Sequence, residues 1–148
     1  MGKGKRAPLP SYKTIAVDVR NAVARVTLAR PDVHNAFNET LITEMTQALS
    51  RLDSDAAVRA VVLLGEGRSF CAGADLNWMK RMAGYGRAEN LADARTLATM
   101  LETLHRMGKP TIARVHGPAF GGGVGLVACC DIVVAAPEAT FSLSEVKL

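Results

Sequence analysis

The sequence predicts an α/β domain, in which apolar strand segments alternate with amphipathic helices. Two observations support this class. Short segments rich in β-branched residues recur along the chain, and segments between them carry apolar residues at helical spacing. The chain has 148 residues, of which 49% are hydrophobic. This length is typical of a single domain that buries its own core.

The first predicted elements of the chain are a hairpin and a helix that follows it. Residues 14–20 and 23–28 alternate and are rich in β-branched residues, and Asn21-Ala22 lies between them as a turn. Arg30-Pro31-Asp32 ends the second strand. Asn38 is a good N-cap for the helix that follows. The apolar residues of this helix recur on one face and are Leu41, Ile42, Met45, Leu49 and Leu52.

A buried strand and a second helix come next. Residues 60–64 form a continuous apolar run, as expected for a strand that is buried on both faces. The second helix is predicted over residues 90–107, because Gly108 and Pro110 then provide a C-terminal cap and a breaker. The apolar stripe assigned to its buried face consists of Leu91, Ala94, Leu97, Leu101 and Leu104.

The last part of the chain repeats the alternation. Strands are expected at residues 111–115 and 132–135. The glycine run at 121–123 is expected to interrupt the chain before the apolar segment 124–130. Strand, helix, strand, helix and strand in this order complete the α/β pattern.

Charge and composition argue against several classes of protein. The net charge is +4, and Lys3, Lys5 and Arg6 account for three of these charges. The remaining body is nearly neutral and only 5% of all residues are aromatic, so we expect no nucleic-acid partner. No apolar stretch reaches the ~20 residues of a membrane-spanning helix, so we expect no membrane partner. We assign residues 1–13 to a flexible basic leader and residues 14–148 to the core domain.

The three cysteines have neither metal-ligand spacing nor the even number of a disulfide framework. They are Cys71, Cys129 and Cys130, and the adjacent pair lies in an apolar stretch where we expect burial. We therefore expect no metal. This cysteine usage indicates a reducing compartment, and hence a cytoplasmic protein.

Two loops rich in small residues follow predicted strands and lead into helical segments. They are Phe70–Leu76 (FCAGADL) and His116–Gly123 (HGPAFGGG). A helix start presents unpaired N–H groups with a partial positive charge, and small residues let a ligand approach them. Two such ends directed at one point would bind an oxyanion. For either loop alone, tight packing of a helix on the sheet explains the glycines better.

Taken in order, these segments resemble a known family. The sequence is similar to the enoyl-CoA hydratase/isomerase (crotonase) family, and within it to bacterial methylglutaconyl-CoA and isohexenylglutaconyl-CoA hydratases. The similarity runs from about Thr14 to the last residue. The motifs that carry it are RPDVHNAF (30–37), FCAGADL (70–76), GPAFGGGVGL (117–126), CDIVVA (130–135) and FSLSEVKL (141–148).

The resemblance implies a ββα-superhelix fold that assembles as trimers or as dimers of trimers. Members of the family are considerably longer, so we expect this chain to contain the N-terminal part of the fold and to be incomplete at its C-terminus. The substrate would be an acyl-CoA thioester. Because CoA is part of that substrate, no separate cofactor is expected.

The resemblance also implies site residues. The backbone N–H groups of Ala74 and Gly122 would polarise the thioester carbonyl. Most contacts to CoA would be made through the backbone, which explains small residues better than side-chain chemistry does. The residues that would line the CoA path are His34, Ala36, Ala72, Gly73, Asp75 and Leu76.

One of the two family carboxylates is absent. A motif position matches Glu145, which we assign as the general acid or base, whereas the other position is Gly125, which has no side chain. Three alternatives follow. Glu145 manages hydration alone, or with the substrate's own carboxylate or another residue. It moves one proton between carbons, as in family isomerases that use one carboxylate. In the third, the chain binds acyl-CoA without catalysis.

Overall fold

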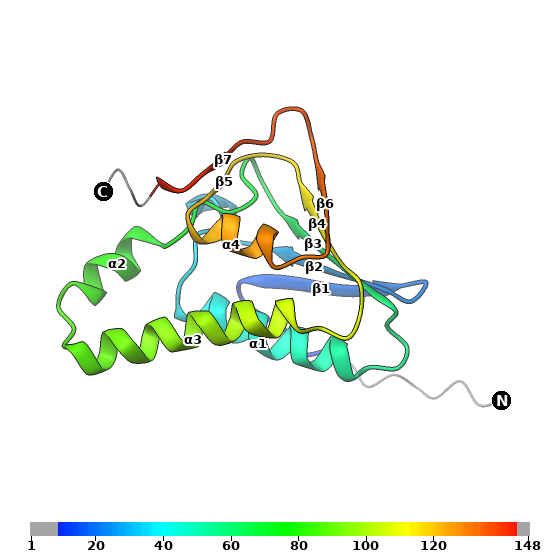
Figure 1. Cartoon of the computed structure of the whole chain (residues 1–148), viewed down its shortest axis with the longest axis horizontal. Coiled ribbons are helices and arrows are strands. Elements are labelled where there is room, and N and C mark those ends of the chain that lie inside the picture. Colours follow the sequence, from blue (N-terminus) through cyan, green and yellow to red (C-terminus); the bar gives the residue numbers. More distant parts are fainter. Residues whose placement is uncertain (1–8, 145–148) are drawn as a thin grey trace.

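The computed structural model describes residues 9–144 and contains a five-stranded sheet within that range, in the order β1-β2-β3-β4-β6 (Figure 1). A separate small sheet pairs two short strands, β5 and β7. The strands are β1 Ile15–Arg20, β2 Val23–Leu28, β3 Ala60–Gly65, β4 Thr111–Val115, β5 Ala119–Phe120, β6 Ile132–Ala135 and β7 Phe141–Ser142. The helices are η1 Pro31–Val33, α1 Glu39–Ser54, α2 Leu76–Met82, α3 Arg87–His105 and α4 Gly122–Ala128. The predicted α/β class is confirmed.

The direction of the strands brings the two small-residue loops to one edge of the sheet. β1 and β2 form the predicted antiparallel hairpin, and Asn21 and Ala22 turn with positive φ angles of 50° and 64°. The β2–β3, β3–β4 and β4–β6 pairs are all parallel. The carboxyl ends of parallel strands lie at the same edge, so the segments after β3 and β4 meet there.

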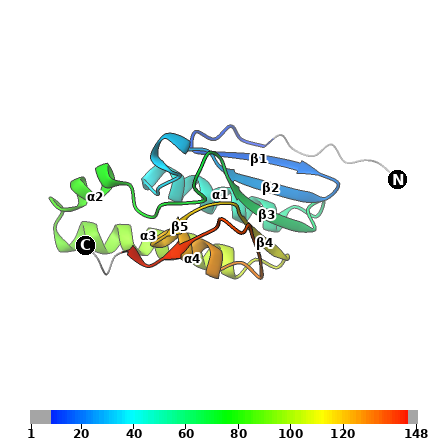
Figure 2. The same cartoon turned by 90° about the horizontal axis from the view of Figure 1, so that it is seen from above.

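Helices α1 and α3 pack side by side along the sheet (Figures 1 and 2). The Asn38 side chain accepts a hydrogen bond from the Leu41 N–H at 2.9 Å, so the predicted N-cap is confirmed. The predicted apolar face of α1 is fully buried. This helix forms where local capping and periodicity both favour it.

The buried stripe of α3 differs from the predicted one. Met100 and Leu104 are buried, whereas Leu91 is 47% exposed and Ala94 is also exposed. The helix begins at Arg87, and its first half, together with α2, extends beyond the sheet and α1 (Figure 1). An apolar residue in that half has no core to face, so the inclusion of Leu91 and Ala94 in the buried stripe was wrong.

The glycine run also differs from expectation, because Gly122 and Gly123 lie inside α4 rather than before it. A methyl group on Gly122 would lie 2.5 Å from the Phe37 ring, and one on Gly123 would lie 2.3 Å from the Cys71 carbonyl oxygen. These glycines therefore do not interrupt the helix. They let α4 approach its neighbours more closely than any side chain would allow.

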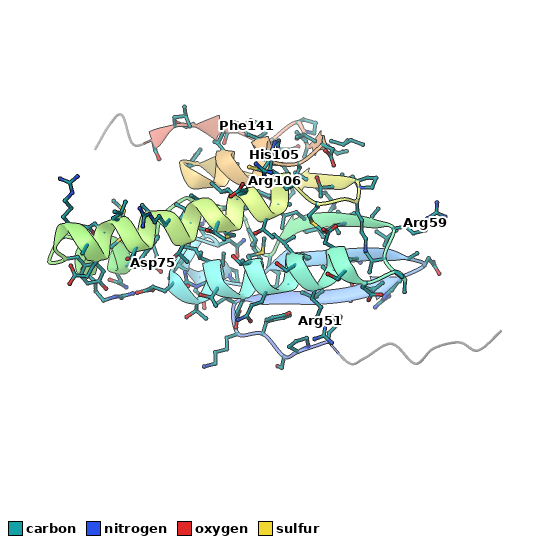
Figure 3. All side chains as sticks on the ribbon, turned by 60° about the horizontal axis from the view of Figure 1, so that its bottom comes forward. Arg51, Arg59, Asp75, His105, Arg106 and Phe141 are labelled. Carbon is teal, nitrogen blue, oxygen red and sulfur yellow. The ribbon has the colours of Figure 1, made fainter. Side chains whose placement is uncertain are left out.

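The outer strand β6 is exposed within the described part of the chain. Ile132, Val133 and Val134 are 52%, 44% and 58% exposed. Phe141 on β7, which Figure 3 labels, is 47% exposed. Cys129 and Cys130, which precede β6, are partly rather than fully buried, contrary to the prediction. An apolar strand at the edge of a sheet is a surface that favours association.

Two residues of the segment assigned to the leader contact the domain. The Lys13 N–H donates to Glu44 at 2.8 Å, and Tyr12 packs against the core. Burial raises the pKa of Tyr12. Among residues 9–144, no helix combines the length and the apolar character that crossing a bilayer requires.

Candidate active site

The segments that follow β3 and β4 are joined by backbone hydrogen bonds. The Phe120 N–H donates to the Cys71 carbonyl at 2.9 Å, and the Phe70 N–H donates to the Pro118 carbonyl at 2.9 Å. Cys71 and Ala119 form a parallel bridge. The two predicted loops are thus one connected structure, as the parallel register of the sheet requires.

A second bridge fixes the backbone around Ala74. The Phe37 N–H donates to the Gly73 carbonyl at 2.7 Å, and the Asp75 N–H donates to the Phe37 carbonyl at 2.8 Å. In this pattern the peptide groups on both sides of Ala74 bond to Phe37. The Ala74 N–H itself has no acceptor among residues 9–144, and Ala74 is exposed.

The Gly122 amide is the first of α4 and has no acceptor within its helix. Its neighbour Gly121 donates instead to the Ser142 carbonyl at 2.8 Å, and Gly121 has a positive φ of 51°. Within the described range, no carbonyl or side chain accepts a hydrogen bond from the Gly122 N–H. A second unpaired amide is therefore present at the start of α4.

These two amides belong to segments in close contact. A methyl group built on Gly73 would lie 3.6 Å from the Gly122 nitrogen and 3.1 Å from the Phe120 oxygen. Gly73 also has a φ of +92°, which side chains rarely tolerate. Glycine at this position therefore allows the Ala74 segment to approach the N-terminus of α4.

Asn35 holds the site segment, although the sequence analysis did not single it out. It is fully buried, and its side-chain amide donates to the carbonyls of Glu66 at 2.8 Å and Ser69 at 2.9 Å. Its backbone has a positive φ of 56°, a conformation that asparagine tolerates better than most residues. The position of Asn35 within RPDVHNAF was the available signal. Its partners, 31 and 34 residues away, were not predictable.

His34 is placed beside the same segment. Its carbonyl accepts from the Ala72 N–H at 2.9 Å, and its Nδ1 lies 3.0 Å from the Ser69 hydroxyl. His116, the first residue of the second small-residue loop, has its Nε2 2.7 Å from the Gly67 carbonyl oxygen. Both imidazoles thus contact the segment between β3 and α2.

Asp75 caps α2 and pairs with Arg30. Its Oδ1 accepts from the N–H groups of Asn77 at 2.8 Å and Trp78 at 3.2 Å, and its Oδ2 lies 2.8 Å from Arg30 Nη2. Burial acts to raise the pKa of the Asp75 carboxyl. The hydrogen bonds from Arg30 and from the α2 backbone outweigh burial, so the pKa is lowered.

A pocket of about 490 Å³ opens beside these segments, at the α2 end of the molecule where Figure 3 labels Asp75. Gly73, also predicted for the CoA path, is buried and does not line it. Lys80 also lines the pocket and supplies a positive charge. The predicted site residues that line the pocket are His34, Ala36, Ala72, Ala74, Asp75 and Leu76.

Of the two positions where the family has carboxylates, the structure describes Gly125 but not Glu145. Gly125 lies on α4, and a methyl group there would meet only the Leu101 methyl carbons, at 3.6 and 3.7 Å. This is ordinary van der Waals contact, so packing does not require glycine at Gly125. Glu145, the predicted general acid or base, lies outside the described residues.

Within the described range, the structure activates no cysteine as a nucleophile near the pocket and gathers no set of metal ligands. Burial raises the pKa of the Cys71 thiol to about 12, so the reactive thiolate is scarce at neutral pH. Residues 9–144 contain no group of three or more histidine, cysteine or acidic side chains placed to hold a metal ion. The distinctive chemistry of the pocket region lies in its backbone.

The model of the enoyl-CoA hydratase/isomerase family matches residues 18–148 of the sequence. The chain belongs to the enoyl-CoA hydratase/isomerase family. The resemblance to this family found in the sequence is thereby confirmed. A solved enoyl-CoA hydratase from Shewanella pealeana superposes with a TM-score of 0.89 at 43% identity, over 91% of this chain and 51% of that one. The predicted crotonase-like fold is therefore confirmed for the part that this chain contains.

Two relatives show the range of names within this family. Hydroxycinnamoyl-CoA hydratase-lyase of Pseudomonas fluorescens is 38% identical over 138 residues, which are 92% of this chain and 50% of the relative. 4-Chlorobenzoyl coenzyme A dehalogenase-2 of an Arthrobacter species is 39% identical over 132 residues, which are 86% of this chain and 46% of the relative. The chain spans about half the length of the curated relatives that it matches.

Proposed function

We propose that the protein acts as an enoyl-CoA hydratase, a lyase that adds water across the 2,3 double bond of an enoyl-CoA thioester. The observation that carries this proposal is the pair of amides of Ala74 and Gly122. They lie in contacting segments, and neither has an acceptor among the described residues. Two preorganised N–H donors at one point suit an oxygen on which negative charge develops.

Hydration creates such an oxygen. As the water oxygen bonds to C3, the π electrons of the double bond move toward the thioester, and the carbonyl becomes an enolate oxygen. The amides of Ala74 and Gly122 stabilise this charge. The enolate then takes a proton at C2, and water has lost one proton, so the atoms balance. Glu145 is the group that accepts and returns protons.

The absent side chain at Gly125 shapes this mechanism. With no carboxylate there, Glu145 acts alone or with a carboxylate of the substrate or another residue. A branched substrate of the glutaconyl type carries a carboxylate of its own, which would supply the group that Gly125 lacks. The whole protein would bind acyl-CoA in the cytoplasm and assemble as a homotrimer or hexamer.

An isomerase is the second candidate, because Gly125 leaves a single carboxylate. In that reaction Glu145 removes a proton from one carbon and returns it to another, and no water is added. The same two amides would stabilise the dienolate. A third candidate is a protein that binds acyl-CoA without converting it.

The test is a panel of enoyl-CoA thioesters, including branched glutaconyl-CoA, incubated with the purified chain. A hydratase consumes the absorbance of the conjugated thioester and gives a 3-hydroxyacyl-CoA, identified by mass. An isomerase gives a product of unchanged mass with a shifted double bond, and a binding protein gives saturable binding without conversion.

The substitution Glu145→Gln addresses the role of the carboxylate. We expect turnover to fall by about 10²–10⁴, the usual contribution of a positioned acid or base. Saturable binding of the thioester should persist in this variant. Unchanged turnover would exclude Glu145 as the group that transfers protons.

A further inference from the structure

A partly buried ion pair joins the segment that contains Ala74 and Asp75 to the segment of residues 30–37, which pairs with it. Arg30 Nη2 lies 2.8 Å from Asp75 Oδ2, and the two side chains are only 17% and 8% exposed. Arg30 Nη1 donates a hydrogen bond to the Ala36 carbonyl. One guanidinium therefore bridges the backbone of one segment and the side chain of the other. Its planar fork suits two acceptors held in fixed directions.

The backbone of Arg30 is fixed, because both its N–H and its carbonyl group are hydrogen-bonded. The Arg30 N–H donates to Asn35 Oδ1 at 2.9 Å. Its carbonyl accepts from the N–H groups of Val33 at 3.1 Å and Asn35 at 2.9 Å. The short helix η1 thus anchors the arginine from which the bridge extends.

The bridge acts next to the Ala74 amide. Ala36 directly precedes Phe37 and Asp75 directly follows Ala74, and Phe37 and Ala74 are the bridge partners described above. Asp75 is also fixed to α2 through its cap hydrogen bonds. Loss of the guanidinium would leave the Phe37–Ala74 bridge supported by its backbone hydrogen bonds alone. The peptide that carries the Ala74 N–H would then have more freedom to rotate.

We infer that Arg30 is a positioning residue, which sets the direction of the Ala74 N–H by holding Asp75 against Ala36. This role rests on the proposed function, in which the Ala74 N–H donates to the thioester carbonyl. A purely structural ion pair would change stability without changing the polarisation of a bound thioester. The two roles therefore differ in a spectroscopic signature.

The probe is cinnamoyl-CoA, a conjugated thioester whose absorbance moves to longer wavelength when its carbonyl is polarised. Titration gives both the Kd and the spectral shift at saturation, for the wild-type chain and for Arg30→Met, Arg30→Lys and Asp75→Asn. Asp75→Asn keeps the cap oxygen of α2 and removes the charge. Arg81→Met is the matched control, because Arg81 on α2 pairs with Glu39 at 2.7 Å and is 51% exposed.

In Arg30→Met and Asp75→Asn, we expect the spectral shift at saturation to fall to about half of the wild-type shift or below. The Kd should rise by less than about tenfold in both variants. Arg30→Lys should restore part of the shift, and Arg81→Met should retain all of it. A folded Arg30→Met with the full wild-type shift would overturn the inference. If Arg30→Met does not fold, a full shift in both Arg30→Lys and Asp75→Asn would overturn it equally.

The titration of the wild-type chain also separates this inference from the proposed function on which it rests. A wild-type chain that binds cinnamoyl-CoA without any shift would reject the oxyanion site, and the role of Arg30 with it. A wild-type shift that survives in the Arg30 and Asp75 variants would reject the positioning role alone.

Discussion

Replacing each of two glycines of α4 by alanine, one at a time, measures how tightly this helix packs against its neighbours. Gly123→Ala places a methyl group 2.3 Å from the Cys71 carbonyl oxygen, a backbone atom that cannot rotate away. Gly125→Ala places the same group at 3.6 Å from Leu101, in ordinary contact. Both positions lie in the same helix, so both variants gain up to about 1 kcal/mol of helix propensity.

The difference between the two variants therefore isolates the steric cost. Overpacking of a core costs about 1–3 kcal/mol, and a backbone contact this short belongs at the upper end. We expect Gly125→Ala to stabilise the fold by about 0.5–1 kcal/mol and Gly123→Ala to destabilise it by about 2 kcal/mol. For a domain of this size, the resulting difference of about 3 kcal/mol corresponds to about 6–12 °C in Tm.

Urea unfolding followed by circular dichroism measures both free energies of unfolding, and equal m-values would show that the unfolded states are comparable. The cinnamoyl-CoA shift of each folded variant then reports whether α4 has moved. Equal stability of Gly123→Ala and Gly125→Ala would refute the account of α4 as a helix held in close contact with the Cys71 backbone.

Two further predictions concern charge and surface. The folded pKa of Asp75 is lowered from its ordinary value of 3.8, so its carboxylate stabilises the fold above that value and loses this effect as pH falls through the folded pKa. Asp75→Asn should therefore be less stable than wild type near neutral pH, and urea unfolding should show the gap closing below about pH 4; a constant gap would contradict this. Val133 is 44% exposed on β6, so Val133→Lys should reduce concentration-dependent self-association, measured by light scattering. An unchanged apparent mass would show that β6 does not mediate association.

The sequence predicted the elements whose causes are local. Helix α1 has its cap at Asn38 and its apolar residues at regular spacing, and both signals lie within the helix itself. The hairpin and the strand β3 were found in the same way. Helix α3 shows the limit of this reasoning, because its periodicity does not reveal which half has a partner. Leu91 has the pattern of a core residue and lies where no core reaches it.

The contacts that build the site join residues far apart in sequence. Arg30 and Asp75 are separated by 45 positions, and no periodicity links them. Gly122 was assigned to a chain break because glycine lowers helix propensity, whereas a close approach to Phe37 requires glycine there. The site residues that were predicted came from motifs rather than from propensities. Their convergence depends on the parallel register of β3 and β4.

A site built from backbone donors responds to substitution in an unusual way. Except for substitution by proline, no mutation at Ala74 or at Gly122 removes the backbone N–H of that residue. Under the proposed function, such donors can be weakened only by moving them. The residues able to move them are those in contact with the two segments, including Phe37, Asn35 and Arg30. Under the same proposal, the residues at positions 125 and 145 are free to differ between relatives and to set the reaction, because neither position supplies a backbone donor.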